Sequence, residues 1–438
     1  METDKTTLAD LSIFNYEEEF SFFNKLNMCT TSRGREQLYN NFCTPLKSVE
    51  EVYGVQQTIQ CIIKQQQLWP RQISNGTIMV IEKFYESTID EIPSGSSSFS
   101  AFTYKLLHSY DFSLVKYSAQ HCFDFIKGMQ LMVQNFLKKE TPLPLRKILE
   151  QAKKIIDKAQ FLIVAEHNRS AELTNPQLLQ FAAFIRYHYK LHILELINAY
   201  AQLDAWLGMA KAVTNYGLQF PQFIETDKPL LQVKGLYHLL LMHPVAYDVE
   251  LTEKNNFLFL TGANMAGKST FIKSVGSAVF LAHTGMGVPA QQMQLSFFDG
   301  LLSNINVADN IVKGESYFYN EVQRIKATVI KINDGKKWLI LIDELFKGTN
   351  VQDAMKCSIT VIEGLLKIKN SLFILSTHLY EIGEDLKKYP NIGFKYFETS
   401  VNGDQLQFSY QLKDGISNDR LGYLILKKEG VVDMLEKL

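Results

Sequence analysis

The ten residues TGANMAGKST, at positions 261–270, constrain the fold of this chain more than any other stretch. They follow the apolar run FLFL and precede STFIKSVGSAVFLAH, so they join an expected strand to an expected helix. Gly262, Gly267, Lys268 and Ser269 complete the pattern G-x-x-x-x-G-K-[ST] in the context that this pattern requires. Glycines at these positions let backbone N–H groups surround a phosphate chain at a helix N-terminus.

The side chains of this loop predict the ligand more closely. Lys268 would reach the β- and γ-phosphates of ATP, and the Ser269 hydroxyl would bind Mg²⁺. Thr270, the next residue, is a further candidate nucleotide contact. The alternative is a chance glycine-rich turn, but the strand and helix on either side favour nucleotide binding.

A second apolar run, WLILIDE at positions 338–344, ends in two adjacent carboxylates. Asp343 would hold the Mg²⁺ shell through water, and Glu344 would act as the general base for hydrolysis. The alternative is an exposed Asp-Glu pair in a loop. We favour the functional interpretation, because the apolar run before the pair indicates a buried strand, where two adjacent carboxylates must be hydrated or paired.

Two further segments are more ambiguous. His378 follows the apolar run SLFILST and is a candidate sensor of the γ-phosphate, although a histidine after a strand is more often structural. The segment 306–325 lies between the two main motifs, whose separation of 75 residues implies at least one extra strand and helix. Gly314 and Ser316 could begin that helix near Tyr317 and form an anion site, or they could simply cap it.

The two halves of the chain differ in periodicity. Residues 1–220 predict an all-α domain, because apolar residues recur at helical spacing in segments such as 145–167 and 176–213. In residues 221–438, short apolar runs alternate with helical stretches, which predicts a parallel sheet with helical crossovers. We therefore expect a helical domain followed by an α/β domain.

Composition limits the partners and the compartment. The 45 basic residues nearly balance the 46 acidic ones, so the chain lacks the overall positive charge that is typical of nucleic-acid-binding proteins. This balance is still compatible with a local basic groove. The five cysteines show no CxxC spacing, which favours reduced thiols over disulfides or zinc. The sequence shows neither a signal peptide nor a membrane span, so we expect a cytoplasmic protein with no membrane partner.

These motifs, taken in order, resemble those of the MutS family of DNA mismatch-repair ATPases, which belong to the ABC-type branch. The phosphate loop is similar to that of the family, including Asn264 and Met265 inside the loop. The resemblance implies that these two residues contact the nucleotide. KGESYFYNEV resembles the family signature, in which the serine, here Ser316, reaches the nucleotide of the neighbouring subunit. Further similar stretches are GVPA (287–290), LIDELFKGTN (341–350), STHLYE (376–381) and DGISNDRLGYLILKKEGV (414–431).

The resemblance extends into the helical half. Residues 22–59 resemble the start of the family's core domain, and residues 199–223 resemble the helix that returns from the lever to the ATPase. It implies a core/lever domain over 1–220 and an ABC-type P-loop ATPase domain over 221–438.

The resemblance also predicts differences from longer family members. The core match begins near residue 20, so we expect the mismatch-reading and connector domains to be missing. The lever segment is short, which predicts a reduced or absent DNA clamp. The nuclease domain of some relatives is expected to be absent as well. Lys347 stands where the family usually has Arg.

Two functions follow from the resemblance and the composition. The first is an ATP-hydrolysing, DNA-binding homodimer with composite ATP sites, linked to mismatch repair or recombination and to other repair proteins. The second is an ATP-driven switch that acts on a protein partner and does not bind DNA directly. The family motifs favour the first function, and the near-neutral charge favours the second.

Overall fold

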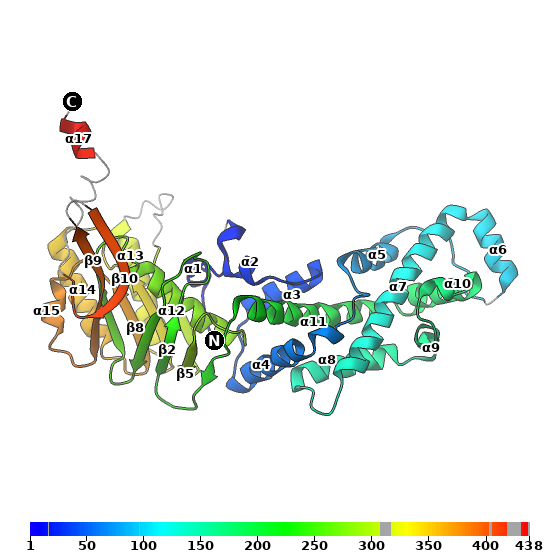
Figure 1. The fold of residues 1–438 in the computed structure, drawn as a ribbon, viewed down its shortest axis with the longest axis horizontal. Coiled ribbons are helices and arrows are strands. Elements are labelled where there is room, and N and C mark those ends of the chain that lie inside the picture. The colour runs from blue at the N-terminus through cyan, green and yellow to red at the C-terminus, as the bar shows by residue number, and fades with distance from the viewer. Residues whose placement is uncertain (16, 96, 307–316, 403–404, 418–430, 437–438) are drawn as a thin grey trace. The chain divides into compact units, whose positions relative to one another are not determined.

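The computed structural model describes all 438 residues except 16, 96, 307–316, 403–404, 418–430 and 437–438 (Figure 1). The chain forms two compact units. One contains Met1–Lys25, Pro45–Val52 and Tyr216–Leu438, and the other contains Leu26–Thr44 and Tyr53–Asn215. Among the described residues, no helix combines the length and the apolarity that crossing a membrane requires.

The second unit is helical. It contains, wholly or in large part, α3 (Ser32–Cys43), α4 (Val49–Lys64), α5 (Asn75–Glu86), α6 (Ser98–Leu107), α7 (Ser109–Phe136), α8 (Leu143–Ile156), α9 (Leu162–Glu166), α10 (Asn175–Ala183) and α11 (Lys190–Tyr216). The long helix α7 packs against α5, α8 and α10 (Figure 1). On α8, the buried residues Leu145, Leu149 and Ala152 recur at helical spacing, so this helix has one apolar face.

The periodic segment 176–213 is not one continuous helix. Phe184–His188 form a π-helical turn between α10 and α11. Near the middle of α11, the buried carboxylate of Asp204 accepts hydrogen bonds from the backbone N–H and hydroxyl groups of Thr30 and Thr31. Because Thr31 is the N-cap of α3, these bonds fix the start of that helix against α11.

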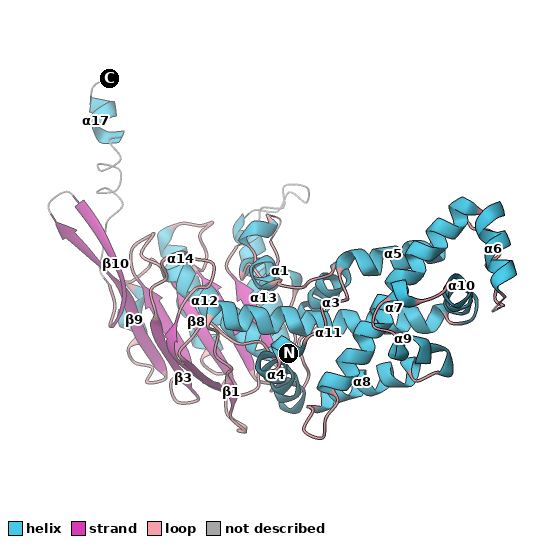
Figure 2. Cartoon of the chain, turned by 45° about the vertical axis from the view of Figure 1, so that its right-hand side comes forward, coloured by secondary structure: helices cyan, strands magenta, loops and turns pink. Residues whose placement is uncertain are grey.

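The first unit contains the described strands (Figure 2). A six-stranded sheet has the order β10-β9-β4-β8-β7-β6, and its strands are parallel except for β10, which is antiparallel to β9. The strands are β4 (Phe257–Thr261), β6 (Gly300–Asn304), β7 (Trp338–Asp343), β8 (Ser371–Ser376), β9 (Ile392–Asn402) and β10 (Gln405–Asp414). Strands β4, β8, β7 and β6 are buried along their whole length, which explains the apolar runs of β4, β7 and β8.

Helices cover both faces of this sheet. Helix α12 (Lys268–His283) contacts β6, β7 and β8 on one face. On the other face, a core of buried side chains such as Phe259 and Ile340 includes residues of α14 (Val351–Leu365) and α15 (Ile382–Leu386). Ile332, the last residue of α13 (Tyr317–Ile332), joins the same core. Helix α17 (Val431–Glu436) follows later in the chain.

A second sheet of four strands has the order β1-β5-β2-β3. Its strands are β1 (Gln222–Phe223), β2 (Leu230–Leu236), β3 (Tyr247–Thr252) and β5 (Gln292–Leu295). Strands β5 and β6 and helix α13 all lie between the phosphate loop and the acidic strand β7. They confirm the prediction that this interval holds extra elements. The all-α region followed by an α/β domain is confirmed as well.

The N-terminal segment packs on the edge strand β6. Glu2 forms a parallel bridge with Gly300, and helix α1 (Lys5–Asp10) contacts the strand. The buried carboxylate of Asp10 accepts hydrogen bonds from the Ser303 hydroxyl and the Ile305 N–H, and it pairs with Arg324 of α13 at 3.1 Å. The segment therefore covers the open edge of the sheet and ties it to α13.

Candidate functional site

The predicted phosphate loop lies between β4 and α12, as the sequence pattern requires. Gly262 has a φ of 136° and Gly267 a φ of 109°, values that side-chain-bearing residues rarely adopt. A Cβ atom on Gly262 would also lie 3.3 Å from three atoms of Phe397. Met265 has a φ of 70°. The two glycines are therefore required by the shape of the loop.

Lys268 begins α12 and is almost fully buried, with 5% of its surface exposed. Its ammonium donates hydrogen bonds to the carbonyl oxygens of Gly262 (2.8 Å) and Ala263 (3.0 Å). Burial lowers the pKa of Lys268, while the carboxylates of Glu344 and Asp343 act in the opposite direction. The lysine thus places a cation against the inner side of the loop.

Asp343 lies at the carboxyl end of β7, in register with Ser376 of β8. Its buried carboxylate accepts hydrogen bonds from the hydroxyls of Ser269 and Ser376. Carboxylate and hydroxyl oxygens are the kind of ligand that Mg²⁺ takes in proteins. Ser269 and Asp343 come from separate motifs, and their side chains are in direct contact. Together they offer the oxygen ligands that fit Mg²⁺.

Glu344 follows Asp343 with a φ of 62°, in the left-handed region. Its backbone N–H donates to the Ser376 carbonyl at 3.0 Å. Its carboxylate lies 3.7 Å from Nδ1 of His378 and 3.1 Å from Nζ of Lys347. The contact with His378, together with Lys347, lowers the pKa of Glu344 to about 2 although partial burial acts to raise it. The side chain is therefore a carboxylate at neutral pH.

The structure brings most of the predicted residues together around one cavity of about 630 Å³. Those that line it are Asn264, Met265, Gly267, Lys268, Ser269, Thr270 and Glu344. Asp343 and His378 adjoin it through their contacts with Ser269 and Glu344. The volume lies within the range of small-ligand sites. Gly314 and Ser316 lie outside the described residues.

The rest of the lining of this cavity was not predicted from the sequence. It is formed by Leu241, His243, Val245, Tyr247 and Tyr410. The first four lie in or just before β3, and Tyr410 lies where the register between β9 and β10 shifts. An apolar and aromatic wall of this kind suits a flat ring. The HPV triplet at 243–245 is the one local feature that marks this wall.

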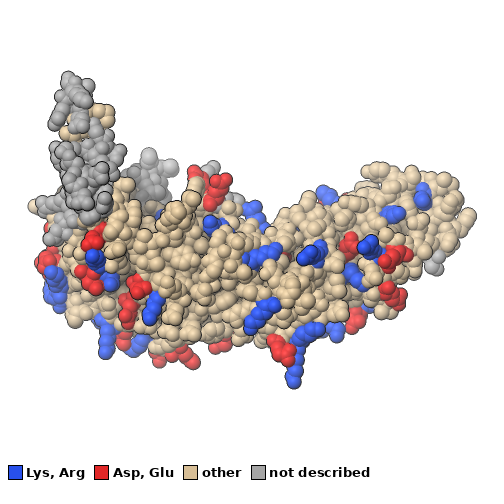
Figure 3. Space-filling view, in the orientation of Figure 1, with Lys and Arg blue, Asp and Glu red and all other residues tan. Residues whose placement is uncertain are grey.

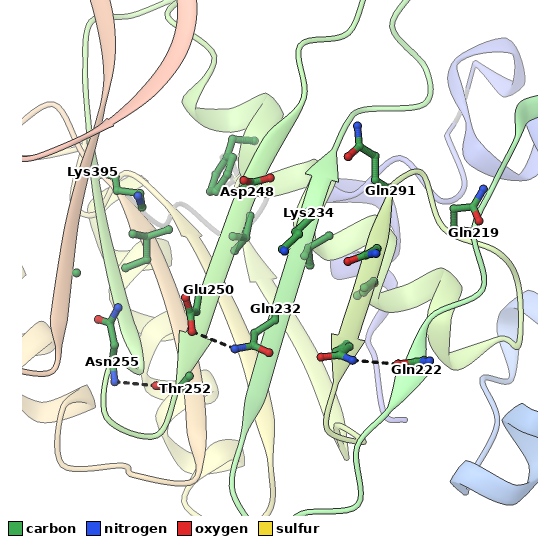
Figure 4. Close-up of a pocket in the computed structure, with 18 of the residues that line it drawn as sticks. Gln219, Gln222, Gln232, Lys234, Asp248, Glu250, Thr252, Asn255, Gln291 and Lys395 are labelled. Carbon is green, nitrogen blue, oxygen red and sulfur yellow. Dashed lines mark hydrogen bonds between the residues drawn. The ribbon is translucent and has the colours of Figure 1, made fainter.

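A larger hollow of about 990 Å³ lies elsewhere in the same unit (Figure 4). Its floor is a polar face of the four-stranded sheet, where Gln294 donates to Gln222 at 2.9 Å and Gln232 donates to Glu250 at 3.0 Å. The residues that line it include none of the predicted site residues. Size alone therefore does not identify the candidate site, and the chemistry of the smaller cavity does.

Comparisons with known proteins agree with this chemistry. Residues 258–435 match the profile of MutS domain V. The chain is similar to the DNA mismatch repair protein MutS of Petrotoga mobilis, with 28% identity over 255 residues that cover 56% of this chain and 30% of that protein. The DNA mismatch repair protein MutS of Thermotoga maritima is 28% identical over 275 residues, 62% of this chain and 34% of the relative.

A human relative, MutS protein homolog 4, is 31% identical over 239 residues, which cover 52% of this chain and 25% of that protein. The matched region therefore spans about a third or less of these curated relatives. MutS domain V is an ABC-type ATPase domain, and the matched residues contain the phosphate loop and the Asp343–Glu344 pair. Residues 258–435 therefore form a MutS domain V, the ATPase domain of the MutS family, in the C-terminal half of the chain.

Proposed function

We propose that this chain binds and hydrolyses ATP in the cavity beside the phosphate loop. The observation that carries the proposal is the meeting of Ser269 and Asp343 next to Glu344, a carboxylate that His378 and Lys347 hold in place. A phosphate cradle alone does not support hydrolysis, because it also needs a metal ligand and a group that orients water. The side chains for all three tasks adjoin one cavity.

The phosphate loop performs binding. The N–H groups around Gly267 and the first turn of α12 face the phosphates with the positive end of the helix dipole. Lys268 supplies the fixed positive charge for the β- and γ-phosphate oxygens. We assign further nucleotide contacts to Gly262, Asn264, Met265 and Thr270.

We assign Mg²⁺ to Ser269 and Asp343. When bound, Mg²⁺ neutralises charge on the β- and γ-phosphates. Asp343 already orients the Ser269 hydroxyl, and the Ser376 hydroxyl holds the second oxygen of this carboxylate. The pair is therefore preorganised before the ion arrives.

Glu344 orients the attacking water in this scheme. Its low pKa keeps the side chain ionised, so it can accept a hydrogen bond from the attacking water and align it as the general base. His378 contacts Glu344 from the exposed side, and we assign it the sensing of the γ-phosphate.

We further propose that the active form is a homodimer in which two subunits share each ATP site. MutS-family proteins generally dimerise, and the sequence resemblance assigns Ser316 to the nucleotide of the neighbouring subunit. Closure on ATP would then couple hydrolysis to the arrangement of the two subunits.

We also propose that the ATPase acts on DNA, in mismatch repair or recombination and together with other repair proteins. This proposal rests on the names of the relatives, two of which are DNA mismatch repair proteins. The charge balance favours the alternative, a switch that acts on a protein partner: the formal net charge is −1. Lys/Arg and Asp/Glu are interspersed on the face that Figure 3 shows.

Two measurements test these proposals in turn. Mg²⁺-dependent release of phosphate from ATP tests the ATPase, and a purified chain that binds no ATP would end the proposal. Fluorescence anisotropy with duplex, mismatched, branched and single-stranded DNA, over a range of salt concentrations, tests the DNA role. Phosphate contacts predict a steep fall in affinity with salt. Absence of binding to all four DNAs, with and without ATP, would favour the protein switch.

A further inference from the structure

Helix α13 carries a buried carboxylate that faces the loop after Glu344. Glu321 is 5% exposed, and its two carboxylate oxygens accept hydrogen bonds from two successive backbone N–H groups. The N–H of Lys347 lies 3.1 Å from Oε1, and the N–H of Gly348 lies 3.3 Å from Oε2. One side chain thus satisfies two neighbouring donors of the loop that carries Glu344.

The loop needs such support because its backbone is unusual. Glu344 and Phe346 both have positive φ angles, 62° and 60°, in the left-handed region that side-chain-bearing residues seldom adopt. Such a conformation persists only where the surroundings hold it. The Phe346 ring is buried and lies 5.7 Å from the Phe318 ring of α13.

Gly348 brings the loop into direct contact with the start of α13. A Cβ atom at this position would lie 2.7 Å from the backbone nitrogen of Phe318 and 2.9 Å from Cδ1 of Tyr317. The glycine is therefore required by close approach to the helix. The loop is held to α13 by this contact, by the ring pair and by the carboxylate of Glu321.

The loop connects Glu321 to the hydrolysis site through Lys347. The backbone N–H of Lys347 is bound to Glu321, and its ammonium lies 3.1 Å from the carboxylate of Glu344. Helix α13 is itself fixed about one turn further along, since Arg324 pairs with Asp10 and donates to the Asn304 side chain. Glu321 therefore sits on a helix that is itself anchored to the edge of the sheet.

From this geometry we infer that Glu321 is a positioning residue for ATP hydrolysis. It holds the loop so that Lys347 and Glu344 keep their mutual arrangement. This inference rests on the proposed function, in which Glu344 aligns the water that attacks ATP. Glu321 is not among the residues that line the nucleotide cavity, and its hydrogen bonds go to Lys347 and Gly348, so it acts on turnover and not on nucleotide binding.

The test variant is Glu321→Gln. An amide keeps the shape of the side chain but offers one acceptor oxygen, so one of the two N–H groups loses its partner. We expect kcat for ATP to fall about 10- to 100-fold, the range that a small displacement of an aligned group produces. The affinity for ATP should stay within about twofold. Gln323→Ala, an exposed change two residues along the same helix, is the matched control and should leave kcat unchanged.

A second variant perturbs the same contact without altering the carboxylate. Gly348→Ala adds a methyl group where the loop meets Phe318, and it should reproduce the loss of kcat. A double variant then separates positioning from general stability. Combined with Glu344→Gln, Glu321→Gln should add less than about a twofold further loss in single-turnover rate, because coupled residues are not additive. A full multiplicative loss would overturn the inference.

Amide hydrogen exchange of the nucleotide-free protein gives a readout that does not depend on activity. Exchange at Lys347 and Gly348 should accelerate in Glu321→Gln, while exchange in β7 stays as in the natural protein. Unchanged exchange at the two amides would overturn the inference, as would faster exchange with unchanged kcat. If the natural protein hydrolyses no ATP, the proposed function fails together with this role in hydrolysis. The exchange result would then still show whether Glu321 holds the loop.

Discussion

The hydroxyl of Ser269 donates a hydrogen bond to the carboxylate of Asp343, although the two residues are 74 positions apart in the chain. Ser269 stands in the first turn of α12, and Asp343 ends β7, a strand separated from β4 by β8. The Asp343 carboxylate also accepts from Ser376 at the end of β8. The ends of two neighbouring strands and the start of a helix therefore meet at one carboxylate, and the proposed metal site depends on it.

Replacement of Asp343 by Asn should raise the Mg²⁺ concentration that ATP turnover requires. The amide keeps the size of the side chain but removes the negative charge that attracts the ion. We expect the half-saturating Mg²⁺ concentration to rise roughly 10-fold or more, the size that metal-site changes typically produce. Phosphate release across a Mg²⁺ titration measures it. The exposed change Asp385→Asn is the control, and equal Mg²⁺ dependence in both variants would remove Asp343 from the metal site.

Replacement of Glu344 by Gln should separate binding from hydrolysis. The amide keeps the shape of the side chain and loses the charge that aligns water, so turnover should fall by about 10²–10⁴-fold. Binding of Mg²⁺-ATP should persist, as measured by equilibrium titration with a fluorescent ATP analogue. Glu384→Gln, at an exposed glutamate of α15, serves as the matched control. Full turnover in Glu344→Gln would place the water-orienting group elsewhere.

Replacement of Lys268 by Ala should abolish nucleotide binding and turnover together. The change removes the one ammonium that the loop carbonyls of Gly262 and Ala263 hold inside the cradle. ATP affinity is measured by calorimetry, and the fold of the variant is checked by circular dichroism. Lys273→Ala, on the same helix, controls for the loss of a positive charge. Unchanged ATP affinity in a folded Lys268→Ala protein would contradict the assignment.

Local pattern was sufficient to predict the main elements of the C-terminal half. A buried parallel strand must be apolar along its whole length, so β4, β7 and β8 are visible as unbroken runs. The glycines of the phosphate loop mark backbone angles that other residues avoid, and those angles are present at Gly262 and Gly267. The fold class was predictable because each of these requirements acts over a few residues.

Contacts between distant residues left no such pattern. Asp10 binds Ser303 and Arg324, which follow it by about 300 positions, and nothing in the first 25 residues predicted their packing on β6. Glu321 was likewise missed, because a glutamate in a helix is ordinarily exposed. Only the fold shows that this one faces the N–H groups of Lys347 and Gly348.

Stability of the natural protein should decrease as the pH falls below about 6.5, and His283 in α12 should carry part of the decrease. This fully buried imidazole contacts the Val279 carbonyl through Nδ1 and accepts from the Phe298 N–H through Nε2, which only the neutral ring can do. Burial is the main cause that lowers its pKa to about 3 in the folded state, from an ordinary 6.5. The unfolded chain therefore binds the proton more readily between these values, and stability is lost as the pH falls.

Urea unfolding at pH 7 and pH 5 measures this effect. At pH 5 the loss from His283 should be on the order of 2 kcal/mol, since the unfolded imidazole is then mostly protonated. The variant His283→Gln removes the titrating group, so its stability should change less between the two pH values. A smaller pH dependence should remain, because burial also lowers the pKa of His238, to about 4. Equal pH dependence in both proteins would exclude His283 as a contributor.

Two inactive variants should restore activity when mixed, if each ATP site is shared between two subunits. Lys268→Ala removes the phosphate contact of a subunit's own site, and Ser316→Arg changes the residue that the resemblance assigns to the partner's site. Each variant alone should be nearly inactive. In a dimer with two shared sites, a mixed pair places both changes in one site and leaves the other site intact. Random mixing of equal amounts makes about half of the dimers mixed, and each has one intact site, so roughly a quarter of the natural turnover should return if sites act independently.

The result depends on exchange of subunits, which is verified with two differently labelled natural proteins by energy transfer. If exchange occurs and the mixture stays inactive, two explanations are possible. Either the sites are shared but work only when both are intact, or each site lies within a single subunit. A dimer of one natural and one doubly changed subunit, Lys268→Ala with Ser316→Arg, distinguishes these cases. Shared sites would then each carry one change, so this dimer should be inactive. Unshared sites would leave the natural subunit active, because all its catalytic groups are in its own chain, and Ser316 would then have no role beyond its own subunit.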